Sequence, residues 1–179
     1  MNNDFTFASN NNFWLVVDTV RIPDALDIVR KEISIEQGLR LFAGSDLDYL
    51  IDQSPWVLNL GSEPSALQCL SLPDFSSSSV VFELSQYCDE TTFLTHLQSV
   101  LLANIESHPC LLRFYTSAFW QPIKNQLNEA DLNTLLGPTT SVVWRDNANQ
   151  QQQIIQREMQ KVLPATPYVL TSDIFKSWV

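Results

Sequence analysis

Short apolar runs, each about the length of one β-strand, constrain this fold more than any other feature of the sequence. The clearest are residues 13–17, which are continuously apolar, and residues 56–60, 80–84 and 141–144. Segments with helical spacing of apolar residues separate these runs, and the most regular is residues 89–106. Continuous apolar runs are typical of strands that are buried on both faces. We therefore expect a layered α/β domain in which short strands alternate with helices, as in βαβ-type units.

The same patterns divide the chain into three parts. Residues 1–12 are rich in Asn, and we predict that they are disordered or loosely attached. Residues 13–145 carry the strand–helix alternation and form the predicted α/β domain, including a fifth strand at residues 110–115. In residues 146–179, an Asn/Gln-rich tract leads into a predicted helix over residues 154–163, so we expect a small helical C-terminal lobe.

Charge is distributed unevenly along the chain. The sequence holds 10 Lys and Arg against 20 Asp and Glu, which gives a net charge of -10. Residues 41–112 contain no Lys or Arg, and their acids are Asp46, Asp48, Asp52, Glu63, Asp74, Glu83, Asp89, Glu90 and Glu106. A segment without Lys or Arg cannot bind phosphates, so nucleic acid and anionic membranes are not expected as partners. Two interpretations of this acidic segment stay open: a solvated surface, or a face complementary to a basic protein.

Motifs for catalysis, cofactors and metals are absent from the sequence. The four glycines are too widely spaced for a phosphate-binding loop, and HExxH, CxxC and GxSxG do not occur. We predict that His96 and His108 are surface or helix-capping residues, and that the three cysteines are reduced. We therefore expect no catalytic, cofactor-binding or metal-binding residue, and no enzymatic activity. No secretory signal is visible, so a cytoplasmic location is expected.

Aromatic residues are the best candidates for contacts with a protein partner. Trp14, Trp56 and Trp144 lie in or beside apolar strands and are predicted to be core residues. Trp120 fits either the core or an exposed anchor. Tyr168, Phe175 and Trp178 follow the predicted C-terminal helix, where aromatic side chains either dock on the domain or bind a partner. Partner contact is predicted for these four residues: Trp120, Tyr168, Phe175 and Trp178.

A series of short motifs gives the chain a family resemblance. In chain order they are Trp14-Leu15-Val16-Val17-Asp18, Pro23-Asp24-Ala25, Leu41-Phe42-Ala43-Gly44, Ser54-Pro55-Trp56-Val57-Leu58, His96-Leu97, Leu111-Leu112-Arg113-Phe114-Tyr115, and Leu135-Leu136-Gly137-Pro138 with Trp144. With these motifs the chain resembles the effector-chaperone or adaptor proteins of type VI secretion systems (Tap/Tec type). The family usually has an acidic residue after Arg-Phe-Tyr, where this chain has Thr116.

The resemblance implies a bacterial, cytoplasmic adaptor without enzymatic activity. Such proteins bind a toxin effector before secretion and help load it onto the VgrG spike. The family-motif residues carried over to this chain are Asp18, Pro55, Trp56, Arg113, Phe114, Tyr115, Gly137 and Pro138. We expect Arg113 to form a buried or half-buried ion pair, with Asp18 as the candidate partner, so its role is expected to be structural.

Two other functions remain compatible with the sequence. An immunity protein would bind the same kind of toxin through its acidic segment but would neutralise it. A carboxylate-dependent enzyme of unrecognised mechanism would use acidic pairs such as Asp89 and Glu90. The attraction of acids to helix N-termini explains that pair without catalysis.

Overall fold

A computed structural model of the chain describes residue 7, residues 10–156 and residues 163–179. Its centre is a six-stranded sheet in the order β2-β3-β1-β4-β7-β8, in which every neighbouring pair is antiparallel. These strands are β1 (Asn11–Val17), β2 (Gln37–Arg40), β3 (Trp56–Asn59), β4 (Ser79–Ser85), β7 (Thr139–Arg145) and β8 (Gln151–Ile155). A smaller three-stranded sheet is formed by β5 (Asn104–Ile105), β6 (His108–Pro109) and β9 (Val169–Leu170).

Eight helices accompany the two sheets in the described residues. They are α1 (Ala25–Glu32), α2 (Phe75–Ser78), α3 (Glu90–Leu101), α4 (Ser117–Ile123), α5 (Glu129–Leu136) and the 3₁₀ helices η1 (Asp48–Gln53), η2 (Pro64–Ser71) and η3 (Asp173–Trp178). The mixed α/β class predicted from the sequence is confirmed. Within the described part of the chain, no helix is long and apolar enough to span a bilayer.

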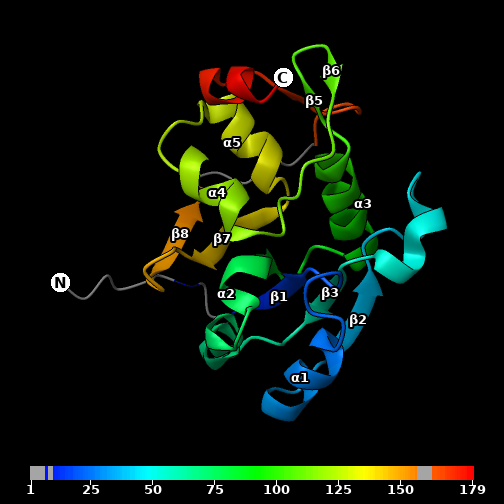
Figure 1. Cartoon of the computed structure of the whole chain (residues 1–179), viewed down its shortest axis with the longest axis vertical. Helices are drawn as coiled ribbons and strands as arrows, with labels where there is room; N and C mark the ends of the chain where they lie inside the picture. Colours follow the sequence, from blue (N-terminus) through cyan, green and yellow to red (C-terminus); the bar gives the residue numbers. More distant parts are fainter. Residues whose placement is uncertain (1–6, 8–9, 157–162) are drawn as a thin grey trace.

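The apolar run of β1 is continuous because this strand is buried on both faces. Trp14 and Val16 lie in one core, which α3, α4 and α5 complete. Phe13 and Leu15 lie in a second core on the opposite face, together with residues of α1, η2 and α2. In Figure 1, α3, α4 and α5 accordingly lie on one side of the large sheet and α1 on the other. Side chains that alternate between faces thus give one strand two hydrophobic environments.

The predicted βαβ-type units differ from the observed topology. Both β1 and β2 are antiparallel to β3, so the connection through α1 joins two strands that run in the same direction. However, β3 is inserted between them, and no two neighbouring strands of the large sheet are parallel. The order of elements along the chain predicted their type but not which strands are neighbours.

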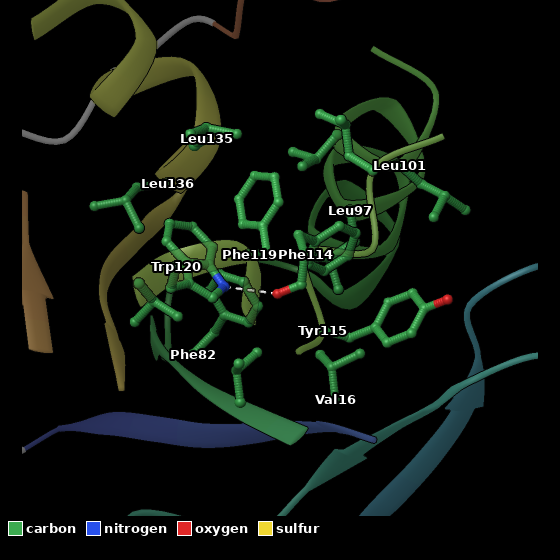
Figure 2. Packing of buried hydrophobic residues seen from close by; sticks show 14 of the residues in the cluster. Val16, Phe82, Leu97, Leu101, Phe114, Tyr115, Phe119, Trp120, Leu135 and Leu136 are labelled. Atoms are coloured by element: carbon green, nitrogen blue, oxygen red, sulfur yellow. Dashed lines mark hydrogen bonds between the residues drawn. The ribbon is translucent and has the colours of Figure 1, made fainter. Parts of the chain in front are cut away.

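The predicted strand at residues 110–115 is wrong. The side chains of Leu112, Phe114 and Tyr115 are buried in the core from an irregular segment, and the backbone of this segment is bonded to the end of α3. The Leu112 N–H donates to the Leu101 carbonyl at 2.9 Å, and the Phe114 carbonyl accepts from Trp120 Nε1 at 2.6 Å (Figure 2). Because side chains and a helix end satisfy these backbone groups, the segment needs no neighbouring strand.

The C-terminal region also departs from the predicted helical lobe. A helix was predicted over residues 154–163, but Ile154 and Ile155 belong to β8, which pairs with β7 in the large sheet. Residues 157–162 of that predicted helix lie outside the described residues. The one helix described after residue 156 is η3. At the other end of the chain, Asn11 and Asn12, predicted to be loosely attached, begin β1.

Candidate partner-binding groove

The predicted ion pair between Asp18 and Arg113 is present and organises one surface of the molecule. Asp18 directly follows β1 and is only 2% exposed. Its Oδ2 accepts a hydrogen bond from Arg113 Nη2 and lies 3.9 Å from Arg21 Nε. Its Oδ1 accepts from the backbone N–H groups of Val20 at 3.0 Å and Arg21 at 3.3 Å. The carboxylate is therefore held from the backbone and from two guanidinium groups at once.

This arrangement leaves an excess of positive charge. Two guanidinium groups face one carboxylate, and the Arg21 and Arg113 side chains are 50% and 47% exposed. The ring of Tyr115 supports Arg113, with its centroid 5.8 Å from the guanidinium carbon. Burial raises the pKa of the Tyr115 phenol above its ordinary value, so this group adds no negative charge at neutral pH.

An apolar hollow of about 340 Å³ lies beside the two arginines, and we call it the arginine groove. Its lining consists of Arg21, Leu111, Leu112, Arg113, Thr116, Ala118, Phe119 and Trp178. Leu112 and Phe119 are buried, whereas Leu111 is 57% and Trp178 39% exposed. Val20 and Val179, which adjoin lining residues in the sequence, are also exposed. Two exposed large apolar side chains, Leu111 and Trp178, therefore line one hollow, a combination that is typical of interaction sites.

Trp178 reaches the groove because the C-terminal segment is docked on the domain. Its ring contacts Phe119 and Phe175 edge-on, at centroid distances of 5.7 and 5.1 Å. The buried carboxylate of Asp131 in α5 accepts from the backbone N–H groups of Thr171 and Ser172 at 2.9 and 2.6 Å. These bonds place the start of η3 against α5 and so position the C-terminal wall of the groove.

A buried histidine holds the same segment from α3. The ring of His96 lies with Nε2 3.2 Å from the Leu135 carbonyl and Nδ1 3.2 Å from the Tyr168 hydroxyl. Since a carbonyl can only accept, Nε2 carries the proton and Nδ1 accepts from Tyr168. Burial lowers the pKa of His96 to about 4, so the ring is neutral. The prediction that His96 is a surface or capping residue is therefore wrong.

The family-motif glycine is explained by this histidine. Gly137 ends α5 with φ +51, and a Cβ atom there would lie 2.3 Å from the His96 ring. A larger residue at position 137 would thus be strained in its backbone and would collide with His96. The motifs His96-Leu97 and Gly137-Pro138 are far apart in the sequence, but His96 and Gly137 pack directly against each other.

Three of the four residues predicted to contact a partner lie in the core. Trp120, Tyr168 and Phe175 are almost completely buried. Trp120 packs among Phe82, Phe114 and Phe119 and gives its indole N–H to a backbone carbonyl (Figure 2). The prediction is corrected for these three residues, because their surfaces are covered by the domain itself. Trp178 alone of the four keeps an exposed face.

The remaining family-motif residues make contacts within the fold. The Pro55 carbonyl accepts from the Leu41 N–H at 3.0 Å, and the guanidinium of Arg40 stacks 4.2 Å above the Trp56 ring. Phe114, Tyr115 and the adjoining Thr116 are buried. At the position where relatives usually have an acid, the Thr116 hydroxyl donates to the Arg113 carbonyl at 3.0 Å. Pro138 directly follows Gly137 and leads into β7.

A second hollow of about 380 Å³ lies where α3 begins, and we call it the acidic pocket. Its lining is Asn12, Trp14, Asn59, Leu84, Ser85, Gln86, Cys88, Asp89, Glu90 and Thr91. Asp89 caps α3, and hydrogen bonds from the hydroxyl and N–H of Thr92 lower its pKa. The buried indole N–H of Trp14 has no hydrogen-bond partner in the described residues. Among these residues, no three His, Cys, Asp or Glu side chains are grouped closely enough to hold a metal ion.

Comparison with known proteins assigns this chain to a family. A model described as a domain of unknown function (DUF4123) matches residues 13–134. The chain belongs to this family. The match covers the large sheet through β4 and nearly all of α5, and it includes Asp18 and Arg113. The description of DUF4123 names no function, and neither a curated protein nor a solved structure matches the chain significantly.

Of the eight residues that line the arginine groove, the sequence predicted only Trp178 as a partner contact. Leu111 lies in the motif Leu111-Leu112-Arg113-Phe114-Tyr115, which was predicted to form a strand. Arg21 carries no motif signal at all. Its role depends on the turn after β1, which brings its guanidinium to the carboxylate that Arg113 binds. Trp178, predicted as a partner contact, lies outside the matched range but completes the groove.

Proposed function

We propose that this chain is a cytoplasmic adaptor that binds a toxin effector of a type VI secretion system and helps load it onto the VgrG spike. The motifs that resemble effector chaperones extend over residues 13–145, which largely coincides with the DUF4123 match. The structural observation that carries the proposal is the arginine groove. It combines exposed apolar side chains with two arginines anchored by a family motif.

The composition of the groove suits a protein interface. Trp and Arg are among the residues that most often dominate binding energy, and both occur here beside an exposed Leu. The groove is small compared with a standard interface, which buries about 800 Å² on each partner. A small apolar contact with a charged rim is compatible with a complex that must later release its cargo.

The surroundings of the titratable groups also favour binding over catalysis. His96 is neutral and holds the C-terminal segment, and Asp131 is occupied by backbone N–H groups. Burial raises the pKa of Cys69 to about 12, so its thiol is not poised to act as a nucleophile. We therefore propose a function in which the groove holds a protein and these groups maintain the fold.

Co-expression tests the adaptor function directly. The tagged full chain is expressed with the toxin encoded by the neighbouring gene and with the VgrG protein, and retained proteins are identified. We expect the wild type to retain the toxin and Leu111→Ser to lose most of it. Tyr49→Ser, which also changes an exposed apolar residue but outside the groove, is the matched control. Retention of neither toxin nor spike by the wild type would refute the proposal.

An immunity function is the second candidate, and the acidic pocket favours it. This pocket draws Asp89 and Glu90 from the segment that contains no Lys or Arg, and it would suit a basic toxin surface. The two functions share a partner and differ in outcome. Protection of a sensitive cell by this chain alone would support immunity, whereas loss of toxin secretion on deletion would support the adaptor.

A further inference from the structure

We propose that the arginine groove binds a short segment of the cargo in which a carboxylate lies beside a large apolar side chain. The inference rests on the proposed adaptor function and specifies the chemistry of the bound segment. It also reverses the expectation from overall charge, because a chain with a net charge of -10 would be expected to select a basic partner.

The charge around Asp18 differs from that around the other ion pairs of the described residues. Arg30 pairs with Asp27, and Lys176 pairs with Asp173, each one to one. Arg21 and Arg113 instead share the single carboxylate of Asp18. One positive charge is therefore not balanced within this group, and both side chains are about half exposed. A carboxylate from a partner would supply the missing negative charge.

The unused hydrogen-bond donors of Arg21 and Arg113 also indicate a carboxylate as the partner group. Both oxygens of Asp18 already have partners: Oδ1 accepts two backbone N–H groups and Oδ2 faces both guanidinium groups. Each guanidinium carries five N–H donors, so donors remain that Asp18 cannot satisfy. A carboxylate can accept two such donors side by side, and this geometry is what arginine binds best.

The apolar wall specifies the second part of the bound segment. Leu111 and Trp178 expose much of their side chains over a floor formed by Leu112 and Phe119. Covering such surface with an apolar side chain contributes about 25 cal/mol per Å² removed from water. The arginines and the apolar wall line one hollow, so the carboxylate and the apolar side chain must be close together in the bound segment.

A short acidic segment fits this chain better than a polyanion does. Electrostatic interactions are screened beyond about 10 Å at 0.1 M salt, so the arginines govern contacts made within the groove. A nucleic acid or an anionic membrane would extend beyond the groove and would be repelled by a chain whose net charge is -10. The occupant that we propose is therefore a segment of a protein.

Charge reversal on both partners tests this inference. Binding of the purified cargo is measured for the full chain and for Arg21→Glu, with Arg30→Glu as the matched control on the surface of α1. We expect Arg21→Glu to weaken binding about tenfold and Arg30→Glu to leave it unchanged. Replacing the responsible cargo carboxylate with Lys should weaken binding to the wild type and restore binding to Arg21→Glu.

Photo-crosslinking identifies the bound segment. A benzophenone amino acid is placed at position 111, and at position 49 in the control chain. We expect position 111 to capture a cargo peptide that contains Asp or Glu next to a large apolar residue. A basic captured peptide, capture from position 49 alone, or capture of a second copy of this chain would overturn the inference. So would equal binding by wild type and Arg21→Glu.

The outcomes separate this inference from the adaptor function. If the wild type binds cargo but Arg21→Glu binds it equally well, the adaptor function stands and the proposed segment chemistry is wrong. If the wild type binds no cargo, the adaptor function itself is refuted.

Discussion

The arginine groove and the acidic pocket are similar in volume but opposite in charge. The groove holds about 340 Å³ between two arginines and exposed apolar side chains, and the pocket holds about 380 Å³ beside Asp89 and Glu90. The pocket has the charge sign of the whole chain, and the groove does not. Net charge therefore describes the average surface of this protein but not the surface that we propose binds a partner.

The two hollows also differ in how their charged groups are used. Asp89 in the pocket is occupied as the cap of α3, and its hydrogen bonds come from within the chain. In the groove, Asp18 is occupied but the arginines bound to it keep exposed donors. Asp89 has its hydrogen bonds satisfied by its own helix, whereas Arg21 and Arg113 share a single carboxylate. The arginines therefore have more capacity to bind a partner than Asp89 has. Three predictions test this comparison, from the largest expected effect to the smallest.

Acidification should destabilise the protein through His96, which holds the C-terminal wall of the groove and lies outside the acidic pocket. The pKa of His96 is lowered from 6.5 to about 4 in the folded state, so above pH 6.5 both folded and unfolded chains are neutral here. Below that pH the unfolded state binds a proton that the folded state does not. Stability should fall as the pH drops from 6.5 to 4, by roughly 3 kcal/mol.

Urea denaturation at several pH values measures this effect. The variant His96→Gln has no imidazole and should lose this part of the pH dependence, whereas His108→Gln, at an exposed site, should keep it. If the wild type and His96→Gln have the same dependence between pH 6.5 and 5, His96 is not the responsible group.

The arginines of the groove should differ in their effect on folding. Arg113→Met removes the closest partner of the buried Asp18 carboxylate, so we expect a loss of about 2 kcal/mol in the free energy of unfolding. Arg21→Met removes a partner at 3.9 Å, and we expect a loss of less than about 1 kcal/mol. Chemical denaturation of both variants gives the two values. Equal losses would show that Arg113 and Arg21 stabilise the Asp18 carboxylate to the same extent.

A substitution in the acidic pocket should have the smallest effect of the three. Asp89→Ala removes the side-chain cap of α3 and should lower the stability of the fold slightly, without weakening cargo binding. The neighbouring Glu90→Ala keeps the cap and serves as the control. The double variant Asp89→Ala with Arg113→Met should show additive losses, because the two hollows share no residue. Strong coupling, or loss of cargo binding in Asp89→Ala, would contradict the distinction between the two hollows.

Element types could be predicted from the sequence wherever a pattern had one interpretation. The apolar run of β1 and the apolar stripe of α3 both occur as predicted, because the spacing of apolar residues is a local property. Residues 110–115 were predicted to form a strand. An apolar run can also fill a core from an irregular segment, and here the hydrogen bonds to Leu101 and from Trp120 replace those of a neighbouring strand.

The candidate site was predictable only in part, for the same reason. The pairing of Arg113 with Asp18 was expected from the family motifs, and the structure confirms it. The burial of Tyr168 and Phe175 was not predictable, since the sequence left docking and partner contact equally open. The hydrogen bond between His96 and Tyr168 holds this segment on the domain, and the two residues are 72 positions apart in the sequence.

By itself, the sequence determined the α/β class, the family motifs and an acidic segment without Lys or Arg, all of which depend on residues close together in the chain. Only the tertiary structure decided that β3 separates β1 from β2, that the C-terminal aromatics dock, and that two arginines converge on Asp18. These features depend on contacts between distant segments, where small differences in packing select one arrangement among several with the same local pattern. The groove is such a feature, since its residues come from three separate parts of the chain.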